Sequence, residues 1–222
     1  MMGSSMDTST PDTRTALLLA ALACFADHGF DGTSMRMIAE RAGRPLSLLS
    51  HYFGNKEGLY LEVFKLLLES TGRQGGPATP PVTLDPQDRA GAIRLLREQI
   101  HLMYEQGAPA SPARQPMEEW GARLWVQEFR SPRPSLHPLF RQYIGPTAEA
   151  IATCLRILRP DLNPAQVAFL GITIIGQVVG HRSMSGINRV LWGDHPPFGS
   201  PFQEAELLVE FCLHGLQTVP PR

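Results

Sequence analysis

The chain has 222 residues with a formal net charge of −1 at pH 7, and 43% of its residues are hydrophobic. A hydrophobic fraction of this size can bury a substantial core, which excludes disorder of the whole chain. Because acidic and basic residues nearly balance, overall charge gives no support for nucleic-acid binding. Any such function must depend on a local excess of positive charge.

The cysteines and the apolar runs indicate the compartment. Three cysteines lie far apart without CxxC spacing, which fits a reducing cytoplasm better than a secreted disulfide scaffold. Residues 1–12 are small and polar, so we expect a flexible arm there and no signal peptide. The longest apolar run, residues 167–180, is expected to be too short to span a bilayer and is interrupted by Gln177. The sequence therefore predicts a cytoplasmic protein without a membrane partner.

Apolar residues recur with helical periodicity along the chain, and no alternating strand pattern persists. The predicted fold is all-α, with a small N-terminal three-helix unit followed by a larger helical bundle. The helix of residues 136–158 is expected to bend at Gly145–Pro146, because Pro146 removes a backbone donor. About nine helices are expected, over residues 13–28, 33–41, 45–53, 56–70, 87–106, 117–129, 136–158, 165–181 and 202–216, with an irregular segment before the last.

Local signals set the ends of the first four helices. Gly29 is a candidate left-handed terminator, and Thr33 or Ser34 can cap the second helix. Pro45 suits the first turn of the third helix, and Asn55 can cap the fourth.

A Gly/Pro-rich stretch, residues 72–86, is the clearest boundary in the chain. A second Pro-rich loop is expected at residues 107–116. The predicted division is a flexible arm (residues 1–12), a DNA-binding domain (residues 13–70) and a C-terminal domain for ligand binding and dimerisation (residues 71–222).

The second and third predicted helices are short and are joined by a turn that contains Ala42–Gly43, a pattern typical of a helix-turn-helix motif. In this motif the second helix enters the major groove of DNA. Between residues 33 and 56, four basic residues oppose only Glu40, which gives a local net charge of +3. Positive charge is thus concentrated where phosphates would approach, and Lys56 lies at a helix start that itself favours an anion.

Candidate DNA contacts follow from the expected exposed positions. His51, Tyr52 and Lys56 can donate hydrogen bonds to phosphates, and the outward face of the recognition helix would meet base edges. Tyr52 could equally be a core residue, and the whole motif could be a helical hairpin that binds protein. The predicted DNA-binding residues are Thr33, Ser34, Arg44, Leu46, Ser47, Ser50, His51, Tyr52 and Lys56.

The segment from Thr33 to Tyr60 resembles the TetR/AcrR family of repressors. The matching residues are Phe25, Gly29–Phe30, Thr33–Ser34, Ile38–Ala39, Ala42–Gly43, His51–Tyr52–Phe53 and Asn55–Lys56–Glu57. The chain departs from the common family pattern at Leu46, where a basic or small polar residue is usual, and at Ser50, where an aromatic residue is usual. We therefore expect few polar base contacts from the recognition helix, with apolar contact to a thymine methyl group as one alternative.

The resemblance implies a ligand-responsive repressor that binds operator DNA as a homodimer and takes a small-molecule effector in its C-terminal bundle. The second domain also resembles, more weakly, the CecR-like branch of the family. The segments that carry this weaker resemblance are Leu124–Phe129, Arg141–Pro146 and, within Gly171–Trp192, Gly176–Gln177 and His181–Arg182.

A physical argument also favours a dimer. The helix of residues 165–180 is apolar nearly all round and must be buried on several sides. The last helix supplies a second apolar face. One face can pack in the core and another against a two-fold partner, although a central core helix alone would give the same pattern.

An effector pocket is expected to combine aromatic walls with a few polar groups. Gln177 is an amide on an apolar helix and needs a partner, although an interhelical hydrogen bond would be the ordinary reason for it. His181 is ordinarily explained as a cation at a helix C-terminus. The predicted effector residues are Trp120, Arg123, Glu128, Phe140, Tyr143, Gln177 and His181.

Two other classes of function remain open. An enzyme is disfavoured, because the sequence has no GxSxG, HExxH, P-loop or dinucleotide motif and no Cys/His cluster with zinc spacing. No catalytic residue, metal or cofactor is therefore predicted. The other alternative is a DNA-binding protein that is controlled by a protein partner or has no small effector.

Overall fold

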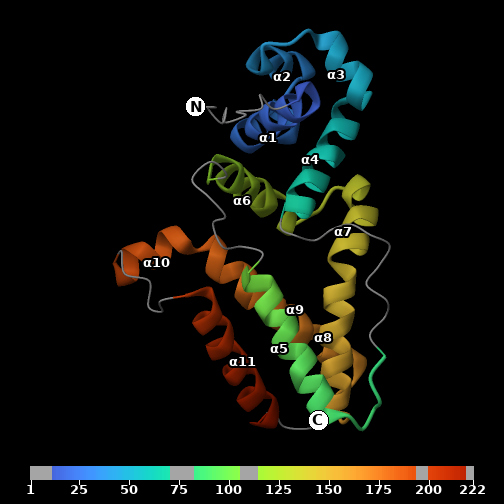
Figure 1. The fold of residues 1–222 in the computed structure, drawn as a ribbon, viewed down its shortest axis with the longest axis vertical. Coiled ribbons are helices and arrows are strands. Elements are labelled where there is room, and N and C mark those ends of the chain that lie inside the picture. The colour runs from blue at the N-terminus through green and yellow to red at the C-terminus, as the bar shows by residue number, and fades with distance from the viewer. Residues whose placement is uncertain (1–11, 71–82, 106–114, 194–199, 219–222) are drawn as a thin grey trace, which may run out of the picture. The chain divides into compact units, whose positions relative to one another are not determined.

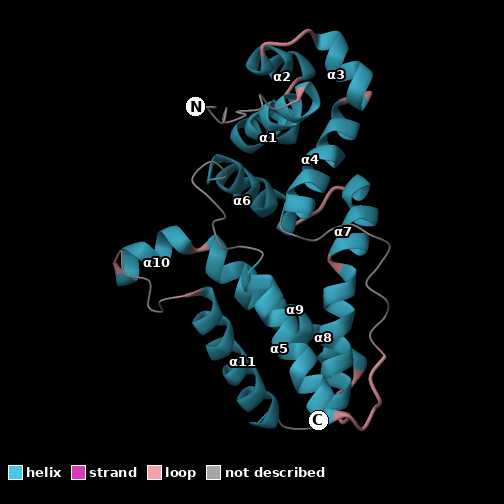
Figure 2. Ribbon diagram, viewed as in Figure 1, coloured by secondary structure: helices cyan, strands magenta, loops and turns pink. Residues whose placement is uncertain are grey.

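The computed structural model describes residues 12–70, 83–105, 115–193 and 200–218. Every regular element among these residues is helical (Figure 2). The helices in Figure 1 are α1 (Thr13–Gly32), α2 (Met35–Ala42), α3 (Leu46–Phe53), α4 (Lys56–Ser70), α5 (Arg89–Glu105), α6 (Gln115–Phe129), the 3₁₀ turn η2 (Pro134–Leu136), α7 (His137–Tyr143), α8 (Gly145–Leu158), α9 (Pro164–Ser183), α10 (Ser185–Trp192) and α11 (Pro201–Thr218).

The all-α prediction is correct, but the described residues contain eleven α-helices where about nine were expected. One difference is at Gly145–Pro146, where Pro146 occupies the first turn of a new helix, so the chain breaks into α7 and α8 instead of bending. The other is α10, which lies in the segment expected to be irregular. Its eight residues place Ile187 and Leu191 on one face, one helical turn apart.

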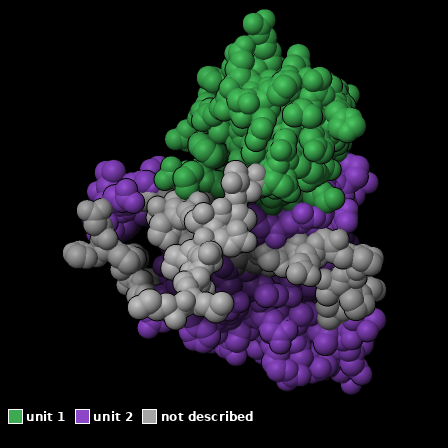
Figure 3. Space-filling view, turned by 45° about the horizontal axis from the view of Figure 1, so that its top comes forward, with its two compact units in different colours: residues 1–67, 111–136 green, residues 68–110, 137–222 purple. Residues whose placement is uncertain are grey.

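The chain forms two compact units, coloured separately in Figure 3. Unit 1 comprises residues 1–67 and 111–136, and unit 2 comprises residues 68–110 and 137–222. Unit 1 therefore includes α6, which packs on α1 although the expected C-terminal domain contains its sequence. The expected arm lies outside the described residues except for Asp12, which caps α1. Most of the two expected Pro-rich loops also lies outside them.

The core of unit 1 is built by α1 and α4, with α3 and α6 against them. Edge-to-face contacts link Phe25, Tyr60 and Phe64, with ring centres 4.8 Å apart for the first pair and 5.1 Å for the second. Gly121 of α6 lets this helix approach α4, because a Cβ atom at Gly121 would lie 2.8 Å from a methyl group of Leu67. These contacts join α1, α4 and α6, while α2 packs against α1 and α3 packs against α2.

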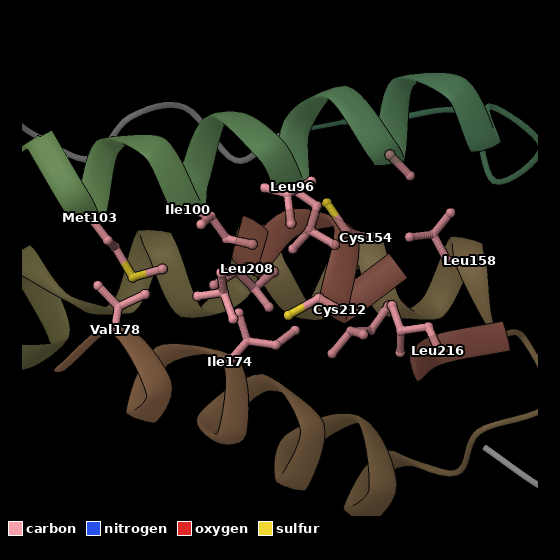
Figure 4. Close-up of a cluster of buried hydrophobic side chains, with 14 of the residues drawn as sticks. Leu96, Ile100, Met103, Cys154, Leu158, Ile174, Val178, Leu208, Cys212 and Leu216 are labelled. Atoms are coloured by element: carbon pink, nitrogen blue, oxygen red, sulfur yellow. The ribbon is translucent and has the colours of Figure 1, made fainter. Parts of the chain in front are cut away.

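The core of unit 2 is formed by α5, α8, α9 and α11 (Figure 4). Leu96, Cys154 and Ile174 come from α5, α8 and α9 and lie in one buried cluster with Cys212 of α11. Burial raises the pKa of the Cys154 thiol to about 12 and that of Cys212 to about 11, so both stay protonated at neutral pH.

The helix α9 is longer than expected. It has 20 residues, and its segment Pro164–His181, with a mean hydropathy of 1.3, is long and apolar enough to cross a bilayer. The apolar run of residues 167–180 was expected to be too short for a bilayer; by length and composition alone the whole helix reaches the required length, because it extends beyond that run at both ends. Val167, Ile174 and Val178 on one face of α9 are buried in the core of unit 2, so this face packs against protein.

Candidate nucleic-acid interface

The turn between α2 and α3 has the geometry of a helix-turn-helix. Ser34 caps α2, since its Oγ accepts a hydrogen bond from the backbone N–H of Met37 at 3.2 Å. Gly43 ends α2 in the left-handed region, with φ +61°, where a glycine costs least. After this glycine α3 begins at Leu46 behind Pro45, which precedes the helix rather than lying in its first turn.

The recognition helix α3 turns one face inward and another outward. Leu49 and Phe53 are buried against the rest of unit 1. Four exposed residues share the outward arc, which spans about 140° at 100° per residue. They are Leu46, Ser47, Ser50 and His51. Only small hydroxyl groups, one imidazole and one apolar side chain are thus available from this arc for base edges.

Tyr52 lies on the flank of α3 and is half exposed, whereas the neighbouring Phe53 is buried. The Tyr52 and His51 rings are 5.6 Å apart. This exposure leaves the Tyr52 hydroxyl accessible, so the side chain is not confined to the core.

The local charge is smaller than the sequence count indicates. Arg41 pairs with Asp27 of α1 at 2.8 Å and lies 5.6 Å from the centre of the Trp120 ring, so it is used within unit 1. The hydrogen bond from Arg41 lowers the pKa of the Asp27 carboxyl. Arg36 makes only an exposed pair with Glu40, and Arg44, exposed beside the turn, makes no ion pair with any described residue. Among the described residues, Arg44 is therefore an exposed cation beside α3 that no carboxylate neutralises.

Lys56 begins α4 and faces the end of α1. Its Nζ donates hydrogen bonds to the carbonyl oxygens of Phe30, at 3.0 Å, and Thr33, at 2.9 Å, and lies 4.4 Å from the centre of the Phe30 ring. An ammonium group has three donors, so one remains for a phosphate. Lys56 thus fixes the end of α1 while keeping one N–H available.

Thr33 lies inside the protein, with 2% of its surface exposed. Its Oγ1 donates to the carbonyl oxygen of Gly29 at 2.7 Å and also lies 3.1 Å from that of Cys24. The hydroxyl proton is therefore used within α1, and Thr33 shapes the connection between α1 and α2. Ser34 is exposed, so its hydroxyl can cap α2 and still donate outward.

The seven predicted effector residues are divided between the two units. Those on α6, in unit 1, have internal partners: Trp120 lies under Arg41, and Arg123 pairs with Asp27 at 3.3 Å. In unit 2, the hydroxyl of the buried Tyr143 donates to Glu69 at 3.2 Å, and Phe140 of α7 is partly buried. Gln177 and His181 are exposed on α9, so Gln177 does not make the buried contact expected of it.

Glu128 of α6 is buried and fully engaged. It accepts a hydrogen bond from the Tyr60 hydroxyl at 2.8 Å and another from the backbone N–H of Arg133 at 2.7 Å. Burial, and then the Glu128 carboxylate, raise the pKa of Tyr60 well above its ordinary value. Glu128 therefore links α4 to the segment that follows α6.

A cavity of about 500 Å³ opens in unit 1 beside this cluster. Its walls are the end of α1 (His28–Gly32), Tyr60, Gln127, Glu128 and the segment Ser131–Pro134. Of the predicted effector residues only Glu128 lines it. Arg133 and Phe30 were not singled out from the sequence as site residues. The one local signal for this cluster was an acidic residue, Glu128, five residues before Arg133.

Comparison with known proteins agrees with this geometry. Residues 17–63, which run from Leu17 of α1 to the middle of α4, match the family described as bacterial regulatory proteins, tetR family. The chain is 25% identical over 191 residues to the HTH-type transcriptional dual regulator CecR of Shigella flexneri, covering 82% of this chain and 81% of that protein. It is also 43% identical over 56 residues to the HTH-type transcriptional regulator RutR of Escherichia coli K12, covering 25% of this chain and only 26% of RutR.

Solved structures show the same fold over nearly the whole chain. A putative fatty acid metabolism regulator of Clostridium perfringens has a TM-score of 0.57 at 18% identity, covering 90% of this chain and 97% of that one. A putative transcriptional regulator of Pseudomonas aeruginosa PAO1 has a TM-score of 0.55 at 23% identity, covering 96% and 94%. The relatives named here are regulators and not enzymes. The helix-turn-helix of unit 1 matches the tetR family of bacterial regulatory proteins, and this match, together with the similarity to CecR and RutR, supports a TetR family regulator.

Proposed function

We propose that this protein is a ligand-responsive repressor that binds operator DNA as a homodimer. The observation that carries the proposal is the outward arc of α3, which is exposed on a helix-turn-helix whose other face is buried. In this proposal residues 13–70 bind DNA and residues 71–222 bind the effector and dimerise, except that α6 packs with the DNA-binding helices.

The proposed DNA contacts follow from exposure and free donors. Lys56, His51 and Tyr52 bind phosphates, and Ser34 donates to a phosphate at the start of α2. Ser47, Ser50 and Arg44 face base edges, and Leu46, 45% exposed, meets a thymine methyl group. In this proposal the buried Thr33 does not contact DNA and only stabilises the connection between α1 and α2. Such a surface would read sequence with few polar groups and obtain much of its affinity from phosphates.

The homodimer is supported by exposed apolar faces on unit 2. Phe169 and Ile172 of α9 are 68% and 63% exposed, and Leu207 and Phe211 of α11 are 52% and 64% exposed. Large exposed apolar side chains of this kind mark an interaction surface. A second copy would cover them about a two-fold axis and present two recognition helices to successive major grooves.

The repressor and effector parts rest on family likeness. AcnR of Corynebacterium glutamicum, 38% identical over 50 residues, is named a repressor, whereas CecR is named a dual regulator. Phe140, Tyr143, Gln177 and His181 remain the proposed effector residues in unit 2, while Trp120, Arg123 and Glu128 have structural partners. Binding of a small molecule in unit 2 would shift the population of dimers away from the arrangement in which both DNA-binding domains fit the operator. The proposed location is the cytoplasm.

Selection of binding sites from a random DNA pool, followed by shift assays on the selected operator, tests the proposal. A palindromic site with half-sites about one helical turn apart is expected. Release of this DNA by one member of a panel of apolar and cationic compounds would support the effector role. If no sequence is enriched, the DNA-binding proposal fails. If an operator is found but only a protein partner releases it, the small-molecule part fails.

A further inference from the structure

The end of α1 lies between two cations. Lys56 of α4 donates hydrogen bonds to the carbonyl oxygens of Phe30 and Thr33 at this end. Arg133, from the segment between α6 and η2, places its guanidinium carbon 3.9 Å from the centre of the same Phe30 ring and pairs with Asp31 at 3.0 Å. A guanidinium or ammonium group over an aromatic face is attracted by the ring quadrupole. Phe30 therefore contacts both cations.

Arg133 is itself held in place. Its backbone N–H donates to the buried Glu128 at 2.7 Å, and its Nε lies 3.7 Å from the same carboxylate. Glu128 also accepts from Tyr60 of α4, whose ring lies 4.9 Å from that of Phe30, edge to face. Arg133 thus has a fixed backbone and a side chain directed at the end of α1.

The end of α1 needs such support because its backbone departs from the helix. Gly29, with φ +71° and ψ 173°, breaks the helix just before Phe30, so the short segment that follows Gly29 depends on side-chain contacts. This segment carries the two carbonyl groups that bind Lys56 and leads directly into Ser34, the cap of α2.

We propose that Arg133 is a positioning residue for DNA binding: by holding Phe30 and Asp31 it fixes the segment that orients the ammonium group of Lys56. Arg133 does not touch DNA in this proposal. The proposal rests on the proposed function, because it assigns a phosphate contact to Lys56. It adds a residue outside the helix-turn-helix on which that contact depends.

The two lysines of the chain, Lys56 and Lys65, allow a test that needs no DNA. In protein with ¹³C-labelled lysine, the ε-methylene signal of Lys56 is expected at high field because of the Phe30 ring, whereas that of the exposed Lys65 is not. Arg133→Met should move the Lys56 signal toward that of Lys65 and leave Lys65 unchanged. Arg133→Lys keeps the positive charge but loses the planar guanidinium group, so the Lys56 signal should lie between its positions in the wild type and in Arg133→Met. An unchanged Lys56 signal in both variants would overturn the proposal.

Binding to the selected operator supplies the second readout. Arg133→Met should weaken binding roughly five- to tenfold at 0.1 M salt and lower the salt slope by about 1, as expected for one lost phosphate contact. In a Lys56→Met background it should have little further effect. A control, Arg156→Met, removes the same charge from an exposed pair with Glu149 on α8 and should leave affinity unchanged.

These readouts separate three results. A purely structural Arg133 would lower the melting temperature, leave the salt slope unchanged and act additively with Lys56→Met, which contradicts the proposal. Absence of any operator for the wild type would refute the proposed function, while the lysine spectra would still decide whether Arg133 positions Lys56.

Discussion

Glu128 is the only charged residue that is buried among those the structure describes. Burying a carboxylate is costly unless hydrogen bonds replace water. The Tyr60 hydroxyl and the Arg133 backbone N–H supply those bonds, and the guanidinium of Arg133 lies nearby. This residue was predicted to contact an effector, and it lines the cavity of unit 1. Its hydrogen bonds join α4 to the segment after α6 and so contribute to the stability and geometry of unit 1.

Replacing Glu128 should destabilise the protein more than replacing its partner. Glu128→Leu leaves the Tyr60 hydroxyl and the Arg133 N–H buried without acceptors, so the free energy of unfolding should fall by about 3 kcal/mol. Tyr60→Phe removes one hydrogen bond and should cost about 1 kcal/mol. Urea unfolding followed by circular dichroism measures both. Equal losses for the two variants would show that the carboxylate has no role beyond the Tyr60 bond.

The Asp27 carboxyl gives unit 1 a dependence on acid pH. Arg41 lowers the pKa of Asp27 from its ordinary value of 3.8, so the charged form is favoured in the folded state. A lowered pKa contributes stability above the unfolded-state value, and this contribution disappears as pH falls through the folded-state value. Wild-type protein should therefore exceed Asp27→Asn in stability at pH 6, and the difference should shrink as the pH falls below 3.8 and disappear once Asp27 is protonated in the folded state as well. Melting temperatures of the two proteins across this range test the expectation; a difference that grows in acid would contradict it.

At the scale of helices, the turn between α2 and α3 depends on one backbone conformation. Gly43 has φ +61°, and a Cβ atom there would meet nothing within 4 Å, so a substitution is limited by backbone strain and not by space. Gly43→Ala should lower the free energy of unfolding by about 1 kcal/mol, while Gly43→Asn should cost less because asparagine tolerates the left-handed region. Urea midpoints measure the difference. If alanine and asparagine were equally tolerated, the strain argument would be wrong.

The helices that the sequence predicts well are those with local signals. Ser34 and Asn55 cap helices as expected, because a capping side chain bonds a backbone N–H only two or three residues away. The same locality explains why α10 was missed: it has eight residues, no capping side chain and a glycine at its end. Its periodic apolar pattern covers too few residues to be distinguished from an irregular segment.

The outward arc of α3 was also predictable, because helical periodicity separates it from Leu49 and Phe53. The partners of the charged groups were not. Arg41 pairs with a carboxylate 14 residues earlier in the chain, and Glu128 meets Tyr60 from 68 residues away. The first pair depends on how α2 packs against α1 and the second on how α6 packs against α4, and no spacing in the sequence expresses either. The sequence therefore indicated the exposed residues of α3 but overestimated the free charge beside them.

At the scale of the whole molecule, α9 carries two apolar faces with different uses. Val167, Ile174 and Val178 fill the core of unit 2, while Phe169 and Ile172 remain exposed on the other side. In a dimer, a second copy would cover the exposed face of α9. A helix of this hydropathy could also place that face against lipid. These alternatives differ in their response to charge at the exposed face.

A charge at Phe169 should separate the two copies without unfolding either. Phe169→Glu places a carboxylate in the proposed interface, where burial without a partner is costly, but in the monomer the same position is exposed to water. Sedimentation velocity should show a monomer in place of a dimer, with unchanged helix content. Because each monomer then offers one recognition helix, operator affinity should fall about 100-fold or more, the usual advantage of two linked sites.

The matched control for this variant is Val126→Glu, which adds the same charge to an apolar residue 54% exposed in unit 1. It should leave the dimer intact. Phe169→Leu, which keeps the face apolar, should also remain dimeric. A wild-type chain that sediments as a monomer and floats with lipid vesicles, with Phe169→Glu abolishing flotation, would assign the exposed face of α9 to a membrane. A chain that stays dimeric after Phe169→Glu would place the interface elsewhere on unit 2, and α11 with Leu207 and Phe211 would be the next face to change.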